Sequence, residues 1–125
     1  RATLDLARTL NTEWANFDCA MAYPGSPLYT LAKQKQWALP DDQGGPGWIG
    51  YAQHAYDCRP LPTDHLTATQ VLAFRDRAFI EYFTHPQYLN MLHRTFGPHV
   101  ATHVADMCRR QVRRRYQDEA TNAAA

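Results

Sequence analysis

The sequence lacks the long apolar run of a membrane-spanning helix, since no stretch approaches about 18 consecutive apolar residues. It also lacks an excess of charge of either sign, because 13 Lys and Arg residues against 12 Asp and Glu residues leave a net charge of +1. Such a balance gives no general attraction to nucleic acid or to an anionic membrane. We therefore expect no membrane association, and nucleic acid is an unfavoured partner.

Cysteine is scarce as well, with Cys19, Cys58 and Cys108 far apart and no Cys-x-x-Cys pair. A disulfide framework would favour an even and closely spaced set, so we expect a reducing compartment and a cytoplasmic location. Any iron–sulfur cluster or structural zinc site held by this chain would have to be assembled from distant residues.

The chain of 125 residues allows one ordinary domain but is too short for a complete (β/α) barrel, which needs about 200 residues. It begins inside a helical pattern, with Leu6 and Leu10 four apart, and has neither an initiator Met nor a signal-peptide core. We therefore expect the chain to be part of a longer protein.

Residues 14–22 alternate as a β-strand does, with Ala15, Phe17, Cys19 and Met21 on one face. A Pro- and Gly-rich turn and a helical pattern over residues 28–37 follow, which together form a βα unit. Asn16 and Asp18 would face a barrel interior and are candidates for lining a substrate site. An equally supported interpretation is that the side chains of Asn16 and Asp18 are solvated or hydrogen-bonded to each other.

Residues 40–65 are rich in Gly and Pro and predict a loop or linker. Within this loop, His54 is a third candidate for lining a substrate site. His54 and Cys58 have the spacing of two metal ligands. A zinc site needs three or four ligands, and no second pair of candidate ligands lies nearby in the sequence, so a metal site here has little support. His99 and His103 lie four apart on a polar helix face, where solvation is the favoured reading.

Residues 66–120 predict a helical extension, and residues 121–125 a tail. Thr67 and Gln70 have the spacing of a capping box, while Pro86, Gly97 and Pro98 divide the region into three helices. We expect the third helix to continue past residue 108, since Val112 and Tyr116 extend its apolar side. The end of this helix is basic, and we favour the interpretation that its cations complement the helix dipole. The alternative is a surface that contacts phosphate. The basic residues are Arg109, Arg110, Arg113, Arg114 and Arg115.

Several of these segments resemble one known family. They are Trp14-Ala15-Asn16-Phe17, the run from Ala20 to Tyr29 (AMAYPGSPLY), Pro60-Leu61-Pro62-Thr63, Phe74 to Phe79, Tyr82-Phe83-Thr84 and Pro86 to Leu89. Together they resemble the C-terminal part of radical S-adenosylmethionine proteins of the type that carries an N-terminal cobalamin-binding domain. The resemblance covers most of residues 3–97.

The resemblance implies an α/β fold going to all-α. Residues 1–39 would form the last βα unit of a partial (β/α) barrel, as helix–strand–helix, followed by the 40–65 loop and the 66–120 helical extension. It further implies that Tyr23, Pro24, Gly25 and Ser26 lie near S-adenosylmethionine. The partners would be the remainder of the same barrel and a small-molecule substrate.

Members of this family are enzymes that use a four-iron, four-sulfur cluster to cleave S-adenosylmethionine to a 5′-deoxyadenosyl radical, and cobalamin is a further candidate cofactor. The cluster motif, C-x3-C-x2-C, is absent from these 125 residues, so the cluster ligands would lie outside this chain. We therefore expect the chain to be inactive alone, and no catalytic residue is assigned.

Two other functions stay open. The first is a small helical interaction module whose basic C-terminal helix binds RNA or an acidic partner. The second is a structural remnant without a catalytic role.

Overall fold

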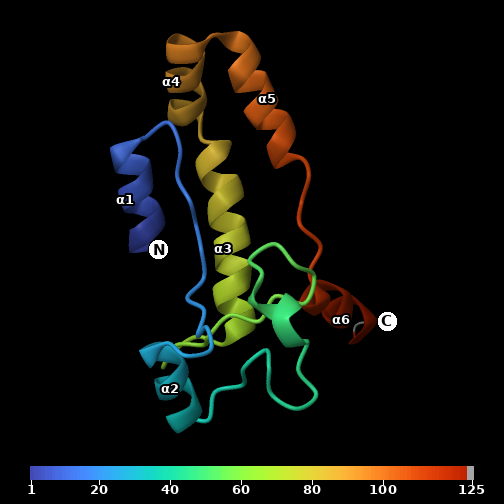
Figure 1. The fold of residues 1–125 in the computed structure, drawn as a ribbon. Coiled ribbons are helices and arrows are strands. Elements are labelled where there is room, and N and C mark those ends of the chain that lie inside the picture. The colour runs from blue at the N-terminus through green and yellow to red at the C-terminus, as the bar shows by residue number, and fades with distance from the viewer. Residues whose placement is uncertain (124–125) are drawn as a thin grey trace. The chain divides into compact units, whose positions relative to one another are not determined.

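The computed structural model describes residues 1–123, and these contain helices and irregular segments but no β-strand (Figure 1). The elements are α1 (Ala2–Leu10), α2 (Pro27–Gln34), the 3-10 helix η1 (Gly47–Tyr51), α3 (Ala68–Phe83), α4 (Pro86–Phe96), α5 (Pro98–Cys108) and α6 (Arg115–Ala123). The expected α/β class, with the last βα unit of a partial barrel at residues 1–39, is therefore wrong.

The chain divides into two compact units. Unit 1 consists of residues 1–17 and 76–111, and unit 2 consists of residues 18–75 together with the segment that begins at Val112. The first half of α3 belongs to unit 2 and its second half to unit 1. No helix within residues 1–123 combines the length and the apolar character needed to cross a membrane.

Unit 1 has an aromatic core built from the end of α3 and the start of α4. The rings of Tyr82, Phe83 and Tyr88 pack with centroids 5.0–5.2 Å apart, and all three side chains are buried. The Tyr82 hydroxyl donates to the Thr12 carbonyl at 2.6 Å, and the Tyr88 hydroxyl donates to the Glu13 carbonyl at 2.9 Å. Each buried phenol thereby has a partner, and the two bonds fix the segment that follows α1.

Local signals define the helix ends in this part of the chain. Pro86 and Pro98 stand in the first turns of α4 and α5, where the missing proline N–H costs no hydrogen bond. Gly97 lies between these helices with φ 88°, a value that glycine adopts without strain.

The 14–22 segment is not a strand, although burial alternates from residue 16 to residue 21. Phe17, Cys19 and Met21 are buried, while Asp18 and Ala20 are exposed. The segment is not a strand because a strand pairs with a ladder of backbone groups on a neighbouring strand, and the hydrogen-bond partners of this segment are of a different kind.

The partner of the Cys19 backbone is instead one side chain. The Gln53 amide accepts from the Cys19 N–H at 3.0 Å and donates to the Cys19 carbonyl at 2.8 Å. One further bond, 3.1 Å from the Leu61 N–H to the Ala20 carbonyl, joins the segment to the loop after η1. An extended backbone is thus satisfied without forming a sheet.

Unit 2 holds two small apolar clusters. The first contains Cys19, Met21, Tyr51, Cys58 and Leu72, and the second contains Ala22, Ala32, Leu39 and Leu61. Both clusters draw on the extended segment and on the loop, so the loop expected over 40–65 is packed rather than free.

The helix predicted to continue past residue 108 ends at Cys108, and α6 begins at Arg115. Val112 therefore lies between two helices rather than on the apolar side of one. Residues 121–123 of the predicted tail belong to α6, and residues 124 and 125 lie outside the described residues.

Candidate functional site

The segment proposed to bind a cofactor, Tyr23 to Ser26, forms a tight turn at the start of α2. The Ser26 N–H donates to the Tyr23 carbonyl at 3.0 Å, and Gly25 has φ +86°. A Cβ added at Gly25 would meet no atom within 4 Å. The glycine is therefore required by the backbone angle, and the space above it is open to a ligand.

The other residues of this turn have separate roles. The Ser26 hydroxyl caps α2 by accepting from the Tyr29 N–H at 3.1 Å, and Pro24 is exposed. The Tyr23 ring, half exposed, stacks on Tyr51 with centroids 5.5 Å apart. The turn thus offers an aromatic face and open backbone, while its hydroxyl is already used as a helix cap.

A hydrogen-bonded aspartate supports this aromatic face. Asp41 accepts from the Tyr51 hydroxyl at 2.5 Å and from the Tyr29 hydroxyl at 2.7 Å. These two bonds, that from Tyr51 first, lower the pKa of Asp41, because they stabilise the charged carboxylate. Burial, followed by the bond to Asp41, raises the pKa of Tyr51 far above its usual range, so Tyr51 remains a neutral donor.

The three candidates for lining a substrate site have unrelated surroundings. Asn16 belongs to unit 1 and accepts from the Trp14 indole N–H at 2.9 Å. Asp18 is exposed in unit 2, and His54, also in unit 2, has its Nε2 atom 2.8 Å from Nη2 of Arg75. A guanidinium can only donate, so Nε2 of His54 is the acceptor in this pair. No hydrogen bond within residues 1–123 joins any two of the three candidates.

The cysteines do not fit a four-iron cluster. Cys19 and Cys58 lie in one apolar cluster of unit 2, whereas Cys108 is buried in unit 1, where burial raises the pKa of its thiol. Such a cluster needs several thiolates grouped together, and burial among apolar side chains favours the neutral thiol. Within residues 1–123, no three His, Cys, Asp or Glu side chains form a group that could hold a metal ion, and both His99 and His103 are exposed.

The arginine run near the C-terminus is largely engaged within the protein. Arg114 is fully buried and donates to the carbonyls of Ala55 and Gln53, both at 2.8 Å. Three of the four exposed arginines pair with carboxylates: Arg109 with Asp106 at 2.7 Å, Arg113 with Asp118 at 2.9 Å and Arg115 with Asp57 at 2.5 Å. The run is therefore not the continuous basic end of a helix that the sequence suggests.

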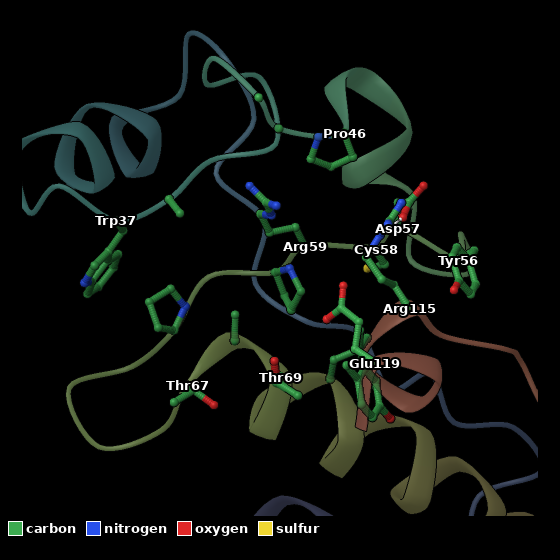
Figure 2. A pocket seen from close by; sticks show the side chains of 18 of the residues that line it. Trp37, Pro46, Tyr56, Asp57, Cys58, Arg59, Thr67, Thr69, Arg115 and Glu119 are labelled. Carbon is green, nitrogen blue, oxygen red and sulfur yellow. Dashed lines mark hydrogen bonds and ion pairs between the residues drawn. The ribbon is translucent and has the colours of Figure 1, made fainter. Parts of the chain in front are cut away.

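Unit 2 also contains a cavity of about 740 Å³ that sequence reasoning missed (Figure 2). Its walls come from the loop between α2 and η1, the segment 56–62, the first turn of α3 and one face of α6. The polar and aromatic side chains that line it include Trp37, Arg59, Thr67, Thr69, Arg115 and Glu119. None of the seven predicted site residues lines this cavity.

The sequence carries only a weak signal for the cavity. Its lining residues are scattered from position 36 to position 119, and no motif joins them. The Gly- and Pro-rich character of residues 40–65 indicates an ordered loop, but it does not identify what faces that loop.

Comparison of the chain with protein-family models, with curated proteins and with solved structures finds no match.

Proposed function

We propose that this chain is the C-terminal part of a radical S-adenosylmethionine enzyme of the type that carries a cobalamin-binding domain. It would act together with a cluster-bearing part and have no activity alone. The proposal starts from the resemblance of residues 20–29 and 60–63 to that family, and one observation in unit 2 supports it.

That observation is the contact between these two segments, which lie far apart in the sequence. The Leu61 N–H donates to the Ala20 carbonyl at 3.1 Å. Ala22 and Leu61 belong to one apolar cluster, and Leu28 and Tyr29 pack against it. These two segments of the resemblance therefore pack together in unit 2, as expected if they serve a common purpose rather than match by coincidence.

Within this proposal, the Tyr23 to Ser26 turn is the part of the chain that faces S-adenosylmethionine. Cleavage of that cofactor would supply a 5′-deoxyadenosyl radical, and the iron–sulfur cluster would be held by cysteines outside this chain. The contribution of these residues is binding: Gly25 leaves its backbone open, and the Tyr23 ring, held by its stack on Tyr51, presents a flat face.

The test compares two glycines of unit 2 in the full-length enzyme. Gly25 and Gly44 both have positive φ, +86° and +79°, and neither has an atom within 4 Å of an added Cβ. Gly25→Val and Gly44→Val therefore impose similar backbone strain without a clash. We expect Gly25→Val to reduce formation of 5′-deoxyadenosine at least tenfold while Gly44→Val retains it.

Two results would contradict the proposal. One is equal cleavage of S-adenosylmethionine by both variants, once circular dichroism shows that both are folded. The other comes from the DNA upstream of the Arg1 codon: an open frame through a C-x3-C-x2-C motif supports the proposal, and a start codon close to Arg1 overturns it.

The alternative of an RNA-binding helical module has less support. Arg114 is buried, and Arg113 and Arg115 are paired with carboxylates, so a phosphate would have to displace internal partners. A salt-sensitive mobility shift with generic RNA that is lost on replacing Arg113 and Arg115 would reverse this ranking.

A further inference from the structure

The cavity of unit 2 contains four charged side chains, of which two neutralise each other. Arg115 and Asp57 form an ion pair at 2.5 Å, and this bond is the main reason that the pKa of Arg115 is raised. Figure 2 shows this pair on one side of the view and Trp37 on the other, with Arg59 and Glu119 between them. The remaining charges, one positive and one negative, decide what the cavity can bind.

Arg59 is the cation of the cavity whose side chain has no partner among the described residues. Its backbone is fixed, because its N–H donates to the Gly50 carbonyl at 2.9 Å and both neighbours, Cys58 and Pro60, are buried. Its side chain is half-buried in the cavity wall, yet its guanidinium has no hydrogen bond, ion pair or ring contact among residues 1–123. A guanidinium held in this way presents a planar set of donors that matches a carboxylate.

Glu119 is the anion of the cavity that has no hydrogen-bonded partner among residues 1–123, although its charge is a minor cause of the raised pKa of Arg115. It stands on α6 one turn after Arg115, and Arg115 is already bound to Asp57. Within the part of the chain that the structure describes, the Glu119 carboxylate has no hydrogen bond or ion pair. Together with Asp57, it would repel a ligand with several negative charges, such as a polyphosphate.

The rest of the lining is suited to an apolar body. Pro46, Pro60 and Pro62 line the cavity, and Trp37 contributes a half-buried indole. The volume of about 740 Å³ lies within the range of about 300–1,000 Å³ that is usual for small-molecule sites.

We propose that this cavity binds a small zwitterion with an aromatic or aliphatic body, of the kind that an α-amino acid represents. Its carboxylate pairs with Arg59, its ammonium group pairs with Glu119, and its apolar part lies against the prolines and Trp37. This site is separate from the Tyr23 to Ser26 turn and does not depend on the proposed function.

The test is isothermal titration calorimetry on the complete protein with three probes of one shape: phenylalanine, phenylpropionate, which lacks the ammonium group, and phenethylamine, which lacks the carboxylate. We expect phenylalanine to bind about tenfold more tightly than either singly charged probe. Arg59→Gln removes most of the affinity for phenylalanine and phenylpropionate but leaves that for phenethylamine. Glu119→Gln has the mirror-image effect, weakening phenylalanine and phenethylamine alone.

The matched control is Arg110→Gln, which removes an exposed arginine that does not line the cavity and leaves all three affinities unchanged. Neither Arg59 nor Glu119 supports the fold through its charged group, so thermal unfolding of the variants should match that of the wild type. Absence of phenylalanine binding at millimolar concentration overturns the proposal. So does an Arg59→Gln variant that binds phenylalanine like the control, or a Glu119→Gln variant that binds phenylalanine and phenethylamine as tightly as the wild type does.

Discussion

Replacing Arg114 by Met tests whether one buried arginine holds unit 2 together. The Arg114 side chain is fully buried, and its two terminal nitrogens donate to the carbonyls of Ala55 and Gln53 at 2.8 Å. Methionine fills part of the space of the arginine stem but offers no donor. The two carbonyls, both on half-buried residues, would then lose these partners, while the Arg114 backbone N–H could still donate to Gln117 Oε1.

The expected loss follows from the cost of leaving a buried carbonyl unpaired, which is about 1–3 kcal/mol per group. Removing the buried charge returns some of this, because a buried cation carries a desolvation cost of its own. We expect a net loss of about 2–4 kcal/mol in the free energy of unfolding. With a urea dependence of about 2 kcal/mol per molar, the unfolding midpoint falls by roughly 1–2 M.

The neighbouring Arg113 provides the control. Its side chain is 80% exposed and pairs with Asp118 at 2.9 Å, an exposed contact of the kind that contributes about 0–1 kcal/mol. Arg113→Met should therefore leave the midpoint almost unchanged, as measured by circular dichroism in urea. If the two variants unfold at the same urea concentration, the buried hydrogen bonds of Arg114 do not stabilise the fold as argued.

Three further predictions concern backbone pairing, alkaline pH and thiol access. Gln53→Ala should lower the free energy of unfolding by about 1–3 kcal/mol, because both hydrogen bonds to the Cys19 backbone are lost; urea unfolding of Gln53→Ala and of Gln43→Ala, an exposed control, measures the difference. Burial raises the pKa of Tyr88 to about 12, so its stabilising contribution is complete below about pH 10 and is lost as the pH rises toward 12. The free energy of unfolding of Tyr88→Phe should therefore depend less on pH in that window. An unchanged dependence on pH would contradict the assignment of this effect to Tyr88. All three cysteines are buried, so a thiol reagent should label them only as fast as the protein opens, and rapid labelling of native protein would show that a thiol is accessible.

Features that depend on neighbours within a few residues could be predicted from the sequence. The capping box at the start of α3 is confirmed, because the Thr67 hydroxyl accepts from the Gln70 N–H at 3.2 Å and the Gln70 amide accepts from the Thr67 N–H at 2.9 Å. The starts of α4 and α5 at Pro86 and Pro98 are of the same kind. Each of these signals concerns one turn of backbone and needs no information about the rest of the chain.

Features that depend on distant partners could not be predicted in this way. Nothing in the run Arg113-Arg114-Arg115 distinguishes the buried middle residue from its exposed neighbours, because the carbonyls that receive it lie about 60 positions earlier. The candidate cavity has the same property, since Trp37, Arg59 and Glu119 come from three separate elements. The arrangement of such residues is set by tertiary packing, to which a sequence window is insensitive.

In the 14–22 segment the predicted strand is absent, but the predicted alternation of buried and exposed side chains is present from residue 16 to residue 21. Alternation reports which side chains are covered, and Phe17, Cys19 and Met21 are covered. It carries no information about the partner of the backbone, and here that partner is the Gln53 amide, which has the same donor and acceptor as a peptide group. A single glutamine side chain can thus satisfy one extended residue where a sheet would use a neighbouring strand. An alternating pattern therefore predicts an extended, half-buried segment, and only the origin of its hydrogen bonds decides whether it is a strand.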